Sequence, residues 1–135
     1  MKRILLMAAS LLFLIPAVQA QETPKINKKN LVIKEWNTDV KTNAKVLDHV
    51  TTYNSDGKKI EEIEYSARKQ KWRKRYEYGA DGKVSKELLY DEFNKLVNYK
   101  KFEYNEFGRK KTQYTYNPKG KLVTVKVFEY KTEDA

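Results

Sequence analysis

The sequence predicts an all-β fold: an antiparallel up-and-down meander of seven to eight strands built from repeated hairpins. From Leu31 onward, apolar and aromatic residues alternate with charged ones, and a tyrosine-based turn recurs at intervals of about 12 residues. No long amphipathic helix interrupts this pattern. An open or curled single sheet is favoured over the alternative, a closed barrel, because Lys recurs midway along the strands and is unfavourable in a sealed core.

The repeated turn consists of a tyrosine, three residues, a Gly or Asn, and then a basic residue. It begins at Tyr53, Tyr78, Tyr90, Tyr104 and Tyr116. A three-residue hairpin loop followed by a β-bulge needs one residue with positive φ, which Gly and Asn tolerate best. The residues predicted for that position are Gly57, Gly82, Asn94, Gly108 and Gly120.

Two degenerate copies extend the repeat toward the N-terminus. One begins at Tyr65 with Lys69 in the Gly position, and the other begins at Trp36 with Val40 there. With these copies included, the turns separate about eight strands. The strands are expected near 31–36, 46–53, 59–65, 72–78, 84–90, 96–104, 110–116 and 122–130.

The turn geometry also predicts which side chains share a face. Each turn tyrosine should face the residue six positions later, as Tyr78 faces Val84. Counting back from each tyrosine in steps of two gives one pattern, basic-x-apolar-x-Tyr, on successive strands. This predicts one aromatic face, a candidate binding surface, and one solvated face. The aromatic face comprises Trp72, Lys74, Tyr76, Tyr78, Lys86, Tyr90, Lys100, Phe102, Tyr104, Tyr114 and Tyr116.

The last strand differs from the others because its second face is also apolar. Val123, Val125 and Val127 occupy that face. We expect this strand to need cover from the first strands, from the N-terminal leader or from another subunit.

The N-terminus has the features of a secretory signal peptide over residues 1–20. Lys2 and Arg3 form a basic n-region, Ile4 to Ile15 form an apolar segment too short for a membrane span, and Ala20 offers a cleavage point. We therefore expect an exported protein, periplasmic or secreted, with no stable membrane span after cleavage. Residues 21–30 are polar and basic and predict a flexible leader, which leaves 31–135 as a single domain.

Charge and composition narrow the classes of partner. The chain carries a net charge of +10 and has no cysteine, which excludes disulfides and thiolate chemistry. Export makes nucleic acid an unsuitable partner, so a glycan, an anionic envelope component or a protein is predicted instead. The alternative is that the lysines only keep the sheet soluble and protect its edges.

No catalytic constellation is apparent. His49 is the only histidine and lies on the predicted aromatic face, and no Gly-x-Ser-x-Gly motif occurs. Glu61 is expected on the same face, in an ion pair with Lys74 rather than in a glycosidase site. We predict no catalytic residue, no metal site and no cofactor. The predicted function is non-enzymatic binding through the Tyr/Lys face, with assembly through the C-terminal strand as the alternative and a glycan hydrolase third.

The tyrosine turns over residues 53–121 resemble the tyrosine–aspartate repeats of Rhs-type bacterial surface and toxin-shell proteins. Here Asp follows the tyrosine only at Asp91, and Asn takes its place at Asn54, Asn105 and Asn117. That resemblance implies hairpins that stack into a long curved sheet. The whole-chain layout is similar to a family of small secreted bacterial proteins classed as a domain of unknown function, which implies no catalytic residues.

Overall fold

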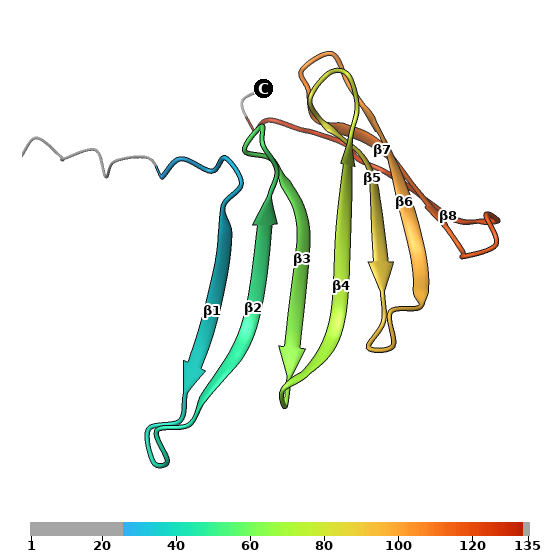
Figure 1. The fold of residues 1–135 in the computed structure, drawn as a ribbon. Coiled ribbons are helices and arrows are strands. Elements are labelled where there is room, and N and C mark those ends of the chain that lie inside the picture. Colours follow the sequence, from blue (N-terminus) through green and yellow to red (C-terminus); the bar gives the residue numbers. More distant parts are fainter. Residues whose placement is uncertain (1–25, 134–135) are drawn as a thin grey trace, which may run out of the picture.

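A computed structural model describes residues 26–133 as one eight-stranded sheet in which every neighbouring pair is antiparallel and the order follows the sequence (Figure 1). The predicted all-β meander is confirmed. The outer strands do not pair with each other, so the sheet is open and not a closed barrel. The strands are β1 (Val32–Thr38), β2 (Lys45–Tyr53), β3 (Lys59–Ser66), β4 (Lys69–Tyr78), β5 (Val84–Tyr90), β6 (Leu96–Tyr104), β7 (Lys110–Tyr116) and β8 (Leu122–Val127).

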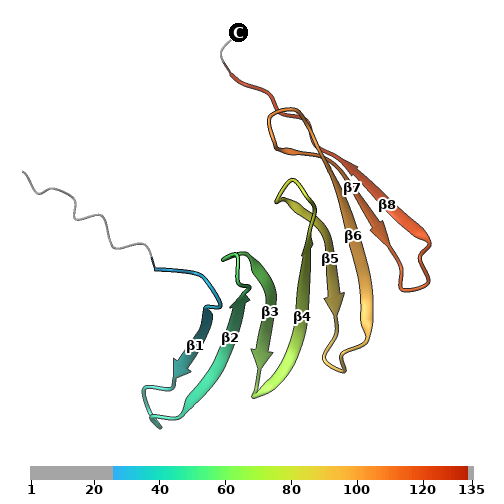
Figure 2. The same ribbon diagram turned by 45° about the horizontal axis from the view of Figure 1, so that its top comes forward.

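The sheet is a single twisted layer within the described residues, and no element covers either face (Figure 2). None of the hydrophobic side chains described is buried, and the most buried residues are Thr51, Thr112 and Gln113. Most soluble domains bury one face of a sheet against a second layer. In this protein the strand ladders and the contacts between neighbouring side chains must supply the stability that a core would otherwise provide.

The predicted three-residue turns are confirmed. Positive φ falls on the five expected residues: Gly57, Gly82, Asn94, Gly108 and Gly120. Asn or Asp recurs directly after the turn tyrosine because its side chain accepts hydrogen bonds from amides of the loop. Asn105 Oδ1 accepts hydrogen bonds from the amides of Phe107 and Arg109, both at 3.0 Å, and so closes the loop. Asn54, Asp91 and Asn117 do the same in their loops.

The prediction of two degenerate copies of the repeat was wrong. The β3–β4 connection is a two-residue hairpin in which Ala67 and Arg68 have positive φ, so Lys69 opens β4 and does not fill a Gly position. Trp36 lies inside β1 opposite Leu47, and positive φ in the β1–β2 loop falls on Asn43. An aromatic residue alone therefore does not mark the turn, whereas Gly or Asn four residues later does.

The predicted single aromatic face was also wrong, and the cause is the β-bulge that follows each turn. Tyr78 lies opposite Val84, as expected, but Glu77 lies opposite Lys86, so Ser85 is an extra residue. One extra residue reverses which face every later side chain of the strand occupies. Tyr90, at the end of the same strand, is thereby turned to the face opposite Tyr78.

We name the two surfaces by one residue each, the Trp72 face and the Tyr90 face. The register of the ladders assigns the predicted residues to them. On the Trp72 face lie Trp72, Lys74, Tyr76, Tyr78, Lys100, Phe102 and Tyr104. On the Tyr90 face lie Lys86, Tyr90, Tyr114 and Tyr116.

Each tyrosine at one end of the sheet is held by the preceding strand. The Tyr78 hydroxyl donates to the Lys59 carbonyl at 2.5 Å, and Lys58 Nζ lies 5.1 Å from the Tyr78 ring centroid. This cation–π and hydrogen-bond pair joins neighbouring hairpins. The same arrangement recurs for Tyr104 with Lys83 and Val84, and for Tyr130 with Arg109 and Lys110.

The described part of the predicted flexible leader is attached to the sheet. The Asn30 amide donates to the Asn54 carbonyl at 2.9 Å, and Lys28 Nζ lies 5.6 Å from the Tyr53 ring centroid. Residues 28 and 30 of the segment predicted as a flexible leader, 21–30, thus contact the first turn of the sheet. The predicted signal peptide, residues 1–20, lies outside the described residues.

Candidate functional site

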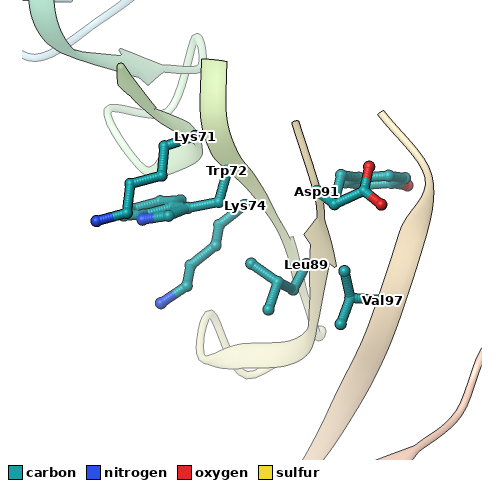
Figure 3. Close-up of a pocket in the computed structure, with 7 residues that line it drawn as sticks. Lys71, Trp72, Lys74, Leu89, Asp91 and Val97 are labelled. Atoms are coloured by element: carbon teal, nitrogen blue, oxygen red, sulfur yellow. The ribbon is translucent and has the colours of Figure 1, made fainter. Parts of the chain in front are cut away.

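A shallow hollow of about 420 Å³ lies on the Trp72 face, across β4, β5 and β6 (Figure 3). Its wall and floor combine one indole, two lysines and two aliphatic side chains, with a carboxylate at the rim. The lining residues are Lys71, Trp72, Lys74, Leu89, Tyr90, Asp91 and Val97.

Two β-bulges shape this hollow. Glu64 pairs with Trp72 and Tyr65 with Gln70, so Lys71 is the extra residue in β4. In the β5–β6 ladder, Val97 is the extra residue of β6, and it lies between the two residues that pair with Leu89 and Tyr90. Bulges re-aim side chains at such positions. Lys71, Trp72 and Lys74 consequently project to one side, with Leu89 and Val97 beside them (Figure 3).

The two lysines near the Trp72 ring differ in their ion pairing. Lys74 Nζ lies 5.0 Å from the Trp72 ring centroid and 3.7 Å from Glu87 Oε1, so its charge is partly neutralised. Lys71 makes no ion pair with any residue in the range 26–133. An aromatic ring, an apolar floor and an available ammonium group suit the flat, partly apolar face of a sugar that carries a negative charge.

A polar cluster borders the hollow on the β2 and β3 side. His49 Nδ1 lies 2.6 Å from Glu64 Oε2, and His49 Nε2 lies 3.6 Å from Glu62 Oε1. Glu62 also accepts a hydrogen bond from the Tyr76 hydroxyl and lies 3.2 Å from Lys59 Nζ. The His49 ring contacts Trp72 edge-on, with 6.0 Å between the ring centroids. The cluster thus connects to the wall of the hollow.

The cluster shifts the pKa values of its members. Burial acts most strongly on His49 and lowers its pKa, but the Glu64 hydrogen bond and the charges of Glu35, Glu64 and Glu62 together outweigh it, so the pKa is raised. For Glu62, burial has the largest single effect and raises the pKa. The hydrogen bond from Tyr76 and the hydrogen bond and charge of Lys59 outweigh burial, so the pKa of Glu62 is lowered. Burial, and then the Glu62 contact, raise the pKa of Tyr76.

The structure corrects the placement of Glu61 and confirms that of His49. Glu61 lies on the Tyr90 face, with Oε2 at 3.9 Å from Arg73 Nη1 and from Arg75 Nε, and not beside Lys74. The bulge between Thr52 and Tyr53 explains the error because it reverses the face of the β3 residues from Glu61 onward. His49 lies on the Trp72 face, as expected.

The remaining predicted residues lie on the Tyr90 face, and among them only Tyr90 also lines the hollow, at its edge. Arg73 covers the Tyr90 ring, with 4.6 Å from Cζ to the centroid, and Lys86 Nζ lies 4.7 Å from the Tyr99 ring. Tyr99 and Tyr116 stack with 5.0 Å between centroids and 11° between planes. These aromatic side chains are already occupied by their neighbours, which fits a structural role.

Sequence reasoning missed Lys71, Leu89, Asp91 and Val97 as site residues. Their positions depend on the bulges after the turns. Asn94 could have signalled the bulge at Val97, whereas the hairpin before Lys71 lacks a Gly or Asn at the corresponding position. On the far side of the Trp72 face, Phe102 lies beneath Lys110, whose Nζ is 4.2 Å from the ring centroid. Lys100 lies opposite Glu87 and Thr115.

Residues 26–133 contain no group of three or more His, Cys, Asp or Glu placed to hold a metal ion. The same residues include no helix of the length and hydropathy that crossing a membrane requires.

The fold and the hollow together define a single-layer antiparallel sheet with an aromatic, basic depression on its Trp72 face. A scan against protein-family models gives no match, and a search of curated proteins gives none either. The chain is similar to one in a structure described as "Crystal Structure of TarM", with 17% identity and a TM-score of 0.36, over 71% of this chain and 21% of that chain. A likeness at this level carries no argument about function, and the resemblances drawn from the sequence stay predictions.

Proposed function

We propose that the protein is a non-enzymatic binding module, exported to the cell envelope, that holds an anionic glycan in the hollow around Trp72. The observation that carries the proposal is the position of Lys71. A bulge places its ammonium group, which has no ion pair within the described residues, beside an indole ring and an apolar floor. A uronate or phosphate-bearing sugar fits this combination because its ring stacks on Trp72 while its charge meets Lys71.

The neighbouring His49 cluster supports a binding role over a hydrolytic one. Glycosidases need two carboxyl groups that face each other across a bound sugar, with one pKa raised. Here Glu62 and Glu64 lie side by side on one strand and are engaged by His49, and the pKa of Glu62 is lowered. We propose that the cluster positions Trp72 and stabilises the sheet.

Fluorescence titration tests the proposal, with a Trp36→Phe background so that Trp72 is the only indole observed. The probe is an oligomer of polygalacturonate, with neutral dextran of similar length for comparison. Saturable quenching by the uronate alone is expected. Lys71→Ala should weaken binding about 5-fold. The Trp72 variants carry no indole in this background, so titration calorimetry measures their binding, and Trp72→Phe should weaken it less than Trp72→Ala, since a smaller ring still stacks.

The matched control is Lys101→Ala, which removes an exposed lysine from the Tyr90 face. It leaves the overall charge equal to that of Lys71→Ala. Equal weakening by both substitutions would show non-specific attraction to a basic protein and would overturn the proposal, as would equal quenching by dextran.

A further inference from the structure

β8 is the most exposed apolar strand of the sheet, and one of its edges is free. Val123 is 60% exposed, Val125 51% and Val127 68%. β8 lies at one outer edge of the sheet, with only β7 beside it (Figure 1). An edge strand of this composition is a template for pairing with another strand unless a charge, a proline or a bulge blocks it.

The backbone groups of β8 that point outward can be identified from the ladder. The Phe128 amide donates to the Lys111 carbonyl at 3.0 Å, so Phe128 faces β7. Backbone groups alternate in direction along a strand, which turns the N–H and C=O groups of Val127 and Val125 away from β7. The side chains of the same residues lie on the Tyr90 face, because Val125 pairs with Tyr114.

β1, the other edge, is protected in the ways that natural sheets use. It carries Lys34 and Glu35 at its centre, and its ladder is shifted by a bulge between Glu35 and Trp36. In β8 the single charge is Lys126, and the bulge is at Val123, near the start of the strand, so that the ladder is regular from Thr124 to Val127. The two edges therefore differ in their capacity for pairing.

We infer that two copies of the chain pair β8 with β8 in antiparallel fashion, about a two-fold axis at Val125. In this register Val125 meets its own counterpart, Val123 meets Val127, and Lys126 meets Thr124, so no like charges face each other. The outward backbone groups of Val125 and Val127 gain partners. Val125 and Val127 of the two copies form one apolar patch on the Tyr90 face of a sixteen-stranded sheet.

The two-fold axis of an antiparallel pair is normal to the sheet, so both copies present the Trp72 face on the same side. A dimer of this kind would offer two hollows to one polymer. The dimer itself depends only on β8, and its test needs no glycan.

Sedimentation velocity of the secreted chain, at protein concentrations from about 1 to 100 μM, tests the pairing. A monomer–dimer equilibrium is expected. Val125→Pro removes an outward N–H that has no role in the β7–β8 ladder and should weaken dimerisation at least 10-fold. Val125→Lys, at a half-exposed position, should do the same by placing like charges at the axis.

Val32→Pro is the matched control. Leu31 accepts from the Tyr53 amide, so the Val32 N–H points outward at the β1 edge and its replacement leaves the β1–β2 ladder intact. Dimers lost with Val125→Pro and kept with Val32→Pro support the inference. A monomer at all concentrations, dimers that survive both Val125 substitutions, or larger assemblies abolished by Val32→Pro, which would indicate β1 pairing with β8, would each overturn it.

Discussion

Lys58 Nζ donates a hydrogen bond to the Gly82 carbonyl at 3.0 Å and so ties one hairpin loop to the next. A Cβ at Gly82 would lie 2.8 Å from the same Nζ, so a side chain there would displace Lys58. Gly108 has a similar neighbour in Lys83, whose Nζ would be 3.2 Å from its Cβ. Lys58 and Lys83 thus each lie against the glycine of the next loop at the same end of the sheet, where positive φ already favours Gly.

Gly82→Ala should destabilise the protein by about 1–2 kcal/mol, since it adds a Cβ at positive φ and displaces Lys58. Urea unfolding followed by circular dichroism measures the change. Asn94→Gly is the control, because it places Gly at the same turn position and should change the free energy of unfolding by less than about 0.5 kcal/mol. Equal effects would show that the turn position imposes no such requirement.

Tyr104→Phe should cost about 1 kcal/mol, because it removes the 2.6 Å hydrogen bond to the Val84 carbonyl while keeping the ring beneath Lys83. Tyr90→Phe provides the comparison, as the Tyr90 ring contacts Arg73 and its hydroxyl has no hydrogen-bond partner within residues 26–133. Thermal or urea unfolding of both variants measures the difference. If Tyr90→Phe were the more costly substitution, the proposed link between hairpins would be incorrect.

His49 should stabilise the fold more in mild acid than in base. Its folded pKa is raised above 6.5, so its contribution is fully present below the unfolded pKa and is lost as pH rises through the folded pKa. His49→Gln should therefore cost about 1 kcal/mol more at pH 5.5 than at pH 8. As the chain holds one histidine, a proton NMR titration reads its pKa directly, and a value below 6.5 would contradict the arrangement with Glu64.

The contribution of Glu62 to stability should depend on pH in the opposite direction to that of His49. Its folded pKa is lowered, so its contribution is present above the unfolded pKa and is lost as pH falls through the folded pKa. Glu62→Gln should lower stability near neutral pH by about 1 kcal/mol, and the difference from the unmodified protein should shrink in acid. Glu61→Gln, at the half-buried site between two arginines, is the neighbouring control and should leave the Tyr76 contact unchanged. A difference for Glu62→Gln that did not depend on pH would argue against the ionised pairing.

The strands and most turns were predictable because their causes are local. Gly108 or Asn94 at the positive-φ position and alternating side chains on either side are sufficient to define a hairpin. The faces were not predictable by simple alternation, because one extra residue such as Ser85 reverses a whole strand. For the same reason Trp72, Lys74 and Tyr76 were correctly grouped within a single strand, while Lys71 and Val97, the bulged residues that complete the hollow, were missed.

Because no apolar side chain is buried in the described sheet, each hairpin depends on its immediate neighbours alone. The chain enters at one edge strand and leaves at the other (Figure 1). Tension applied to the two ends would therefore act on β1 and β8 first and peel the sheet strand by strand, with the contact between Lys58 and Tyr78 and its equivalents yielding in turn. A sheet with this mechanical behaviour lengthens in small steps under load, whereas a domain with a shared core resists and then fails all at once.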